Sequence, residues 1–277
     1  MEAEPFQTEL VHDEFLGKPC FKRAAGGFSL THWIADKWGN QVRPHGHIDP
    51  HFVFVTGGHY VSTATAEPGR GRSQLVYNPP NTFHRDRFES RPASFFTISA
   101  TAELIHEAGG VSFPRAPTQI GHSTAHTIVR KLMRECPQWQ PDSALLIESL
   151  CFELISAIGS PLEVDHRNAP IWLKAVRDML QDGYANEIRI KDISRLVGVH
   201  PIHVTRTFRA FYGCTPGDFL RVCRTQRAAE LLTSTRLTLV EVALESGFAD
   251  QSHLTRHFRH RYGVSPGKYR RLIAPHR

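Results

Sequence analysis

An internal repeat near the C-terminal end constrains what this chain can fold into. The segment from His203 to Gly217 reads HVTRTFRAFYGCTPG, and the segment from His253 to Gly267, fifty residues later, reads HLTRHFRHRYGVSPG. Histidine, threonine, arginine, phenylalanine, tyrosine, glycine and proline recur in register, which chance similarity rarely produces. The repeat predicts one supersecondary unit used twice. With only two copies, we expect a pair of similar units and not a solenoid.

Each copy has the pattern of two helices joined by a tight turn. In the first copy, apolar residues at helical spacing predict a helix over 190–197, and a second helix is expected over 201–212. In the second copy, the corresponding helices are expected over 239–246 and, after Asp250 as N-cap, up to Tyr262. Two helices joined by a short turn containing glycine form a helix-turn-helix motif.

The second helix of each copy carries a polar, basic face opposite its apolar face. Arginine and glutamine reach base edges and phosphates well because they offer long, branched donors. A single helix of this kind is most often a solvated amphipathic helix, but two copies with the same face favour DNA binding. The candidate DNA-binding residues are Ile202, Thr205, Arg206 and Arg209 in the first copy, and Gln251, Ser252, Thr255, Arg256 and Arg259 in the second.

The spacing and charge of this region agree with double-stranded DNA as a partner. A third helix, expected over about 215–234, would span roughly 28 Å at about 1.5 Å per residue. That length is close to the ~34 Å between successive major-groove faces of a duplex. Residues 170–277 carry 18 Lys+Arg and 9 Asp+Glu, whereas residues 1–169 carry 15 and 18. A basic bias is common in soluble domains and is informative here because it coincides with the repeat.

The region from about 170 to 273 resembles the AraC/XylS family of bacterial transcription regulators. The resemblance is most specific over Ala243–Arg270, and residues 198–216 match the weaker upstream half of the family pattern. It implies a seven-helix domain at 170–277 with two helix-turn-helix units, the first of which sets sequence preference. It also implies RNA polymerase as a partner. The positions that the family places against bases are Ile202, Thr205 and Arg206, and Gln251, Ser252 and Arg256.

Residues 1–115 have the pattern of short β-strands separated by glycine turns. Runs rich in β-branched and aromatic residues are typical of a sandwich or barrel. The AraC resemblance implies a cupin-like barrel (jelly roll) here, which would bind a small-molecule effector. The chain is thus expected to be a multi-domain α and β protein with an all-α C-terminal domain. The strands are expected over 28–33, 52–56, 60–65, 75–77 and 95–99.

Four histidines in this N-terminal region are candidate ligands of a metal or an effector. His45 and His47 are two residues apart, so on a strand they face the same side. His51 and His84 follow in a layout similar to the metal ligands of cupins, with His51 in the place of the cupin acid. Imidazole is a common ligand of divalent transition metals. The alternatives are an organic effector in the same place, or histidines with hydrogen-bonding or surface roles in a chain that has 17.

The segment between the two domains is expected to be helical and then extended. Helical spacing over 116–160 predicts helices that pack on the barrel, pair with a second copy of the chain, or do both. The AraC resemblance implies that a helix pair here carries dimerisation, so a homodimer is expected. Residues 161–169, charged and bounded by prolines, read as the interdomain linker. Five cysteines without CxxC spacing indicate a reducing compartment, and no apolar run suggests a signal peptide or membrane span.

These features predict a cytoplasmic transcription regulator that is not an enzyme. One rival interpretation is a metal-dependent cupin enzyme, or a metal sensor, fused to a DNA-binding domain. A second rival keeps DNA binding but gives the barrel no effector and only a role in dimerisation.

Overall fold

The computed structural model of the protein describes residues 8–10, 14–38, 41–62, 74–106, 113–121, 124–159 and 168–273. Its internal contacts divide the chain into two compact units. The β unit comprises residues 1–138 and 150–163, and the helical unit comprises residues 139–149 and 164–277. Most of the expected linker at 161–169 lies outside the described residues. No helix in the described part of the chain has the length and apolarity needed to cross a membrane.

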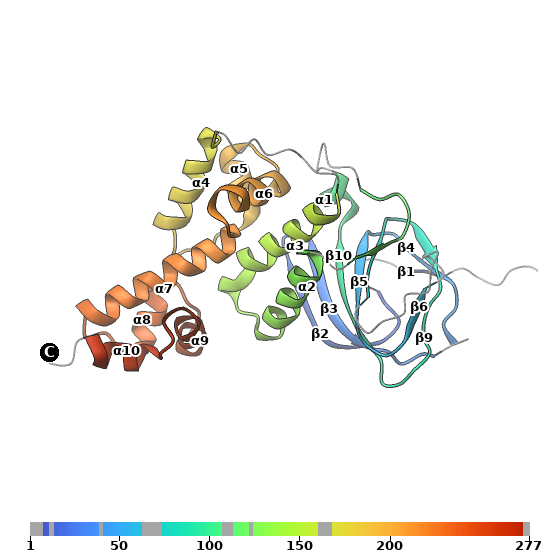
Figure 1. Cartoon of the computed structure of the whole chain (residues 1–277), viewed down its shortest axis with the longest axis horizontal. Helices are drawn as coiled ribbons and strands as arrows, with labels where there is room; N and C mark the ends of the chain where they lie inside the picture. The colour runs from blue at the N-terminus through green and yellow to red at the C-terminus, as the bar shows by residue number, and fades with distance from the viewer. Residues whose placement is uncertain are drawn as a thin grey trace, which may run out of the picture. The chain divides into compact units, whose positions relative to one another are not determined.

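The described strands of the β unit form three sheets (Figure 1). The largest is antiparallel with strand order β11-β7-β5-β10-β3-β2. Its strands are β2 (Lys18–Ala25), β3 (Phe28–Ile34), β5 (His51–Gly57), β7 (Leu75–Asn78), β10 (Ser94–Ala100) and β11 (Thr118–Ile120). A second sheet contains β1 (Thr8–Leu10), β4 (His45–His47) and β8 (Thr82–His84), and a third contains β6 (Tyr60–Ser62) and β9 (Asp86–Phe88).

A sheet-rich N-terminal region was expected and is present, but the described strands do not form a closed barrel. Among the described strands, the two smaller sheets are not hydrogen-bonded to the large one, and no sheet closes on itself. The cupin-like barrel therefore stays a prediction. Strand β11 also lies beyond residue 115, where the sequence placed the end of the β region, because Thr118–Ile120 pairs with β7.

The two faces of the large sheet have different neighbours, as the alternation of side chains along a strand requires. Phe54 contacts the ring of His126 on α2 (Thr124–Glu135), at 5.9 Å between centroids. Phe28 contacts Phe152 on α3 (Ala144–Ile158) at 4.9 Å. Val53 and Val55, which alternate with Phe54, belong to a different core with Trp33, Tyr60, Phe88 and Phe95. The short helix α1 (Ala102–His106) follows β10.

Helix α3 is buried almost all round within one chain. Every residue from Ala144 to Ile155 is buried. Its wide apolar arc, which the sequence left open to a partner chain, is used inside the protein. Its first residues, 144–149, cluster with the helical unit and the rest with the β unit. Two 3₁₀ turns, Cys136–Gln138 and Pro141–Ser143, precede it.

The helical unit confirms the helices expected from the repeat (Figure 1). They are α4 (Ile171–Asp182), α5 (Ile190–Val197), α6 (Pro201–Tyr212), α7 (Pro216–Ser234), α8 (Leu239–Glu245), α9 (Gln251–Tyr262) and α10 (Pro266–Ile273). Local signals explain the boundaries. Asp250 caps α9 by accepting a hydrogen bond of 2.7 Å from the backbone N–H of His253. Gly213 and Gly263 end α6 and α9 with φ of 70° and 73°, a left-handed conformation that favours glycine.

The start of α3 packs closely against the start of α7 inside the helical unit. A Cβ placed on Gly217 would lie 2.3 Å from Cα of Leu146 and 2.6 Å from its backbone nitrogen. At the equivalent position of the second copy, Gly267, the nearest atom would be 3.6 Å away. The segment 139–149 therefore contacts the first helix-turn-helix unit in a way that has no counterpart at this position of the second.

Candidate DNA-binding surface and histidine site

Helix α9 presents the polar face that the sequence predicted. Gln251, Ser252, Arg256 and Arg259 are exposed and Thr255 is half-buried. The five residues together line a shallow open hollow on the surface. The apolar side of the helix is fixed by Leu254 and Phe258, both fully buried against α7 and α8. Packing therefore turns a row of hydrogen-bond donors and two guanidinium groups outward, which is the chemistry needed to contact phosphates and base edges.

Helix α6 differs from α9 at the matching positions. Arg209 is exposed and Arg206 is half-buried, but Ile202 is 0% exposed and Thr205 is 1% exposed. The expectation that Ile202 and Thr205 lie on an open surface is thus wrong for this structure. Ile202 is apolar and gains free energy by burial. Burial of Thr205 is less favourable, because its hydroxyl has no hydrogen-bond partner among the described residues.

A buried polar network ties the segment 139–149 to both helix-turn-helix units. Asp142 lies 2.8 Å from Nδ1 of His253 on α9 and 3.5 Å from Nη1 of Arg224 on α7. The guanidinium of Arg224 also donates to the carbonyls of Tyr184, Asn186 and Asp142, at 2.7, 3.0 and 3.0 Å. None of these contacts was predicted, because they join residues that no local pattern connects.

Glu148 makes the equivalent connection at the first unit. Its carboxylate is 1% exposed and accepts hydrogen bonds from the backbone N–H of Ile190 at 2.8 Å and from Arg189 at 3.2 Å. Ile190 is the first residue of α5, so this carboxylate supplies a partner for one of the open N–H groups at the helix start. Burial raises the pKa of Glu148, and its hydrogen bonds with Ile190 and Arg189 oppose that shift.

Three of the four predicted histidines converge in the β unit. His45 and His84 are register partners across β4 and β8, and His47 lies on the same side of β4 as His45. The ring centroids of the three are 4.8 to 5.1 Å apart, and each ring offers one nitrogen within 4.8 Å of the others. All three residues are buried.

Each ring is oriented by its surroundings. Nδ1 of His45 donates to the carbonyl of Arg43 at 2.9 Å, and Nδ1 of His84 lies 3.1 Å from a carboxylate oxygen of Asp86. The hydroxyl of Tyr60 donates to the other oxygen of Asp86. The Nε2 atoms of His47 and His84 are buried and have no hydrogen-bond partner among the described residues. Asp86 therefore orients the ring of His84.

His51 lies beside the three but is differently engaged. Its Nδ1 donates to the carbonyl of Asp49 at 3.1 Å, and its Nε2 accepts from the amide of Asn78 at 3.0 Å. Both ring nitrogens are used, so His51 has no lone pair left for a ligand. The expectation that it replaces the acidic ligand of cupins is not supported by this geometry.

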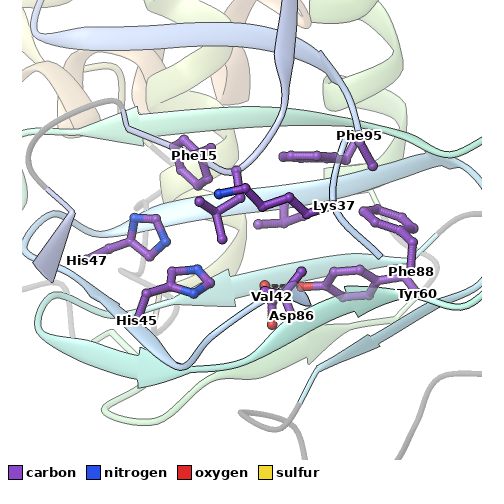
Figure 2. Close-up of a pocket in the computed structure, with 12 residues that line it drawn as sticks. Phe15, Lys37, Val42, His45, His47, Tyr60, Asp86, Phe88 and Phe95 are labelled. Carbon is purple, nitrogen blue, oxygen red and sulfur yellow. Dashed lines mark hydrogen bonds between the residues drawn. The ribbon is translucent and has the colours of Figure 1, made fainter. Parts of the chain in front are cut away.

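Two of the histidines, His45 and His47, line a small cavity. Figure 2 shows His45 and His47 pointing into it, with Asp86 and Tyr60 hydrogen-bonded at its other end. Its volume is about 40 Å³. Tyr60 forms part of its aromatic wall. Phe15 and Lys37 also line it and were not foreseen, because they lie in segments without a periodic pattern. The other lining residues are Leu16, Ala35, Val42, Val53, Phe88 and Phe95.

Burial controls the protonation of this cluster. Burial, together with the neighbouring histidines, lowers the pKa of His47 to about 2 and that of His51 to about 4. Burial also lowers the pKa of His45. Burial by itself would raise the pKa of Asp86, but the contact with His84 and hydrogen bonds from Ser62 and Tyr60 lower it overall. At neutral pH the imidazoles of His45, His47 and His51 are therefore neutral and Asp86 is a carboxylate. Imidazole and carboxylate are donors that suit a divalent metal ion.

Comparisons with known proteins identify the helical unit. Residues 193–272 match a family profile described as a helix-turn-helix domain. The chain is 31% identical over 194 residues to the uncharacterized HTH-type transcriptional regulator YbfI of Bacillus subtilis (strain 168), covering 64% of this chain and 68% of that protein. It is 25% identical over 73 residues to the lactose operon transcription activator of Staphylococcus xylosus, covering 26% of each chain.

A solved structure with a similar sequence in this region is that of the DNA-binding domain of AdpA, a global transcriptional factor, in complex with a target DNA. The two are 26% identical with a TM-score of 0.36, and the match covers 38% of this chain and 97% of that one. The doubled helix-turn-helix unit, its open polar helix face and the similarity to YbfI lead to one assignment. The chain belongs to the AraC/XylS family of helix-turn-helix transcription regulators.

Proposed function

We propose that the protein recognises specific DNA sequences through α9 and α6, and that its β unit binds a small effector that controls this recognition. The open face of α9 is the observation that carries the first part. Five hydrogen-bonding side chains of that face surround one hollow, and two of them are arginines. Arginine pairs well with guanine in the major groove, while phosphate contacts position the helix on the duplex.

The two recognition helices have different roles in this proposal. Helix α9 is ready to contact DNA, since Gln251, Ser252 and Arg256 are exposed. Helix α6 offers Arg206 and Arg209, but Ile202 and Thr205 require a local rearrangement before they contact base edges. The unpartnered hydroxyl of Thr205 gives such a rearrangement a free-energy gain, because a hydrogen bond to DNA or water would replace an unsatisfied buried group.

The first test replaces Arg256 by alanine in the full chain. A preferred duplex is first selected from a random-sequence pool, and its Kd is measured by fluorescence anisotropy. Loss of a base-contacting arginine should cost about 1–3 kcal/mol and relax base preference at one position. The matched control is Arg261→Ala, which removes an exposed arginine from the same helix outside the proposed face. Equal effects of the two substitutions, or no selected sequence at all, would contradict the proposal.

The small cavity favours a regulatory role over an enzymatic one. Pockets for organic ligands usually measure about 300–1,000 Å³. The cavity beside the histidines measures about 40 Å³, which holds only a few water-sized groups. An organic substrate does not fit there without rearrangement. This observation supports a regulator with a small ligand and gives no support to an enzyme acting on an organic molecule at this place.

A homodimer, contact with RNA polymerase and a cytoplasmic location complete the proposal. Burial of α3 within one chain means that a dimer interface has to use another surface. Light scattering coupled to size-exclusion chromatography tests the dimer directly. A mass of twice 31.3 kDa is expected, and a monomer at micromolar concentration would contradict this part.

A further inference from the structure

We infer that the β unit binds one divalent first-row transition-metal ion, held by Nε2 of His45, His47 and His84. This inference names the ligand of the proposed effector site. Its regulatory meaning rests on the proposed function, but binding of the ion does not. The three rings come from two paired strands, so backbone hydrogen bonds between β4 and β8 fix their relative positions.

The spacing of the rings suits a metal site that needs only a small adjustment. One nitrogen from each ring lies within 4.8 Å of the others. Around a tetrahedral ion with metal–nitrogen bonds of about 2.0–2.1 Å, ligand nitrogens lie about 3.3 Å apart. Binding of an ion therefore requires the imidazoles to rotate about their side-chain bonds so that these nitrogens approach one another. Three imidazole ligands also leave a coordination position for water or another small ligand.

The buried lone pairs require a partner. Nε2 of His47 and Nε2 of His84 are both buried without a hydrogen bond in the part of the chain that the structure describes. A buried polar atom left unsatisfied costs about 1–3 kcal/mol. The residues around these atoms are mainly apolar, with Phe15 stacked on His47 at 4.7 Å. A bound cation would satisfy both lone pairs at once.

The neighbours of the ligands have the arrangement seen around metal-bound histidines. Such histidines commonly donate their second N–H to a carbonyl or carboxylate, which fixes the tautomer and leaves the other nitrogen free. His45 does this with the carbonyl of Arg43, and His84 lies against Asp86, which Tyr60 holds in place. His51 is excluded as a ligand because Asn78 donates to its Nε2.

Charge and volume limit the kind of ligand. The cavity of about 40 Å³ is large enough for an ion with one or two waters. Asp86 supplies the negative charge that favours a cation. Lys37 lines the same cavity with an exposed side chain, and its positive charge opposes binding of a cation. A divalent ion that also carries a bound hydroxide or small anion reduces this repulsion.

The test measures zinc binding by the full chain, purified without a polyhistidine tag and stripped by chelator. Isothermal titration calorimetry and elemental analysis should give one Zn²⁺ per chain. His47→Gln removes a ligand and should raise Kd by about 100-fold or more, and Asp86→Asn should raise it by about 10–100-fold. His59→Gln is the matched control, because His59 lies in the same unit but pairs with Glu89 at the surface. His51→Gln tests whether His51 is a ligand or only a neighbour of the site, and this variant should keep the ion bound.

Two further measurements distinguish loss of the metal site from misfolding of a variant. Far-ultraviolet circular dichroism checks each fold, and Co²⁺ should give wild-type visible absorption bands that are absent in His47→Gln. No stoichiometric metal in the wild type, or equal loss in His47→Gln and His59→Gln, would overturn the inference. So would loss of zinc in His51→Gln with retention in a folded His47→Gln. DNA is absent from these assays, so failure of metal binding and failure of DNA recognition are separate results.

Discussion

Gly217→Ala tests the packing of segment 139–149 on the first helix-turn-helix unit. The repeat provides its own control, because Gly267 occupies the same register in the second copy. A Cβ on Gly217 would meet backbone atoms of Leu146 at 2.3 and 2.6 Å and of Leu145 at 3.0 Å. Backbone cannot rotate out of the way as a side chain can, so the whole segment has to move.

The expected magnitude follows from these distances. Carbon atoms in contact lie about 3.5–4.0 Å apart, so Leu146 has to retreat by more than about 1 Å. Forced overpacking of this kind costs about 1–3 kcal/mol. The same shift strains the hydrogen bonds of Glu148 to Ile190 and Arg189. Replacement of glycine by alanine also stabilises the helix by up to about 1 kcal/mol through helix propensity. At Gly267 this stabilisation should be the main effect.

The assay is urea unfolding of both full-length variants, followed by far-ultraviolet circular dichroism. Gly217→Ala should lower the free energy of unfolding of the helical unit by about 1–3 kcal/mol. Gly267→Ala should leave it unchanged or raise it by up to about 1 kcal/mol. If both variants behave alike, the segment does not pack on α7 as described, and the reasoning is refuted.

Three further predictions concern the buried polar groups of the helical unit. Arg224→Met should lower the free energy of unfolding of the unit by about 3–5 kcal/mol, because three carbonyls and the Asp142 carboxylate lose their partner. The control Arg195→Met, at the surface, should change this free energy by less than about 0.5 kcal/mol in the same urea assay. Glu148→Ala should lower the thermal midpoint by an amount equivalent to about 2–4 kcal/mol, because it leaves Arg189 and the start of α5 without their acceptor. Burial, with nearby Arg221, lowers the pKa of His257 to about 2, below the ~6.5 of an unfolded chain. The neutral His257 ring therefore contributes fully to the free energy of unfolding above about pH 6.5, and this contribution declines as the pH falls. By about pH 5 the loss should reach about 2 kcal/mol, and His257→Gln should remove that share of the pH dependence in unfolding titrations, whereas an unchanged slope would show that the ring is not held neutral.

The helices of the repeat were predictable because their signals are local. Proline at the first helical position, glycine after the last one and Asp250 as N-cap lie within a few residues of the boundary that each determines. The strands were predictable for a similar reason, since β-branched and aromatic runs correspond to β3, β5, β7 and β10.

The errors and omissions depend on long-range packing. Ile202 and Thr205 were placed on an open face by register with the second copy, but burial is decided by tertiary neighbours that the register does not contain. His51 shares the spacing of a ligand, yet Asn78 on a neighbouring strand occupies its nitrogen. The contact of Asp142 with His253 joins residues 111 positions apart, and nothing in either local sequence indicates it.

Control of DNA binding by the histidine site is best measured as the affinity of the full chain for its selected duplex with Zn²⁺ bound and with Zn²⁺ removed. We expect specific binding by the wild type and a change in Kd of at least about fivefold between the two states, which is the usual lower limit of allosteric coupling. His47→Gln should bind the duplex but should not respond to zinc. An identical Kd in both wild-type states would contradict control by the histidine site, and absence of specific binding in either state would contradict DNA recognition itself.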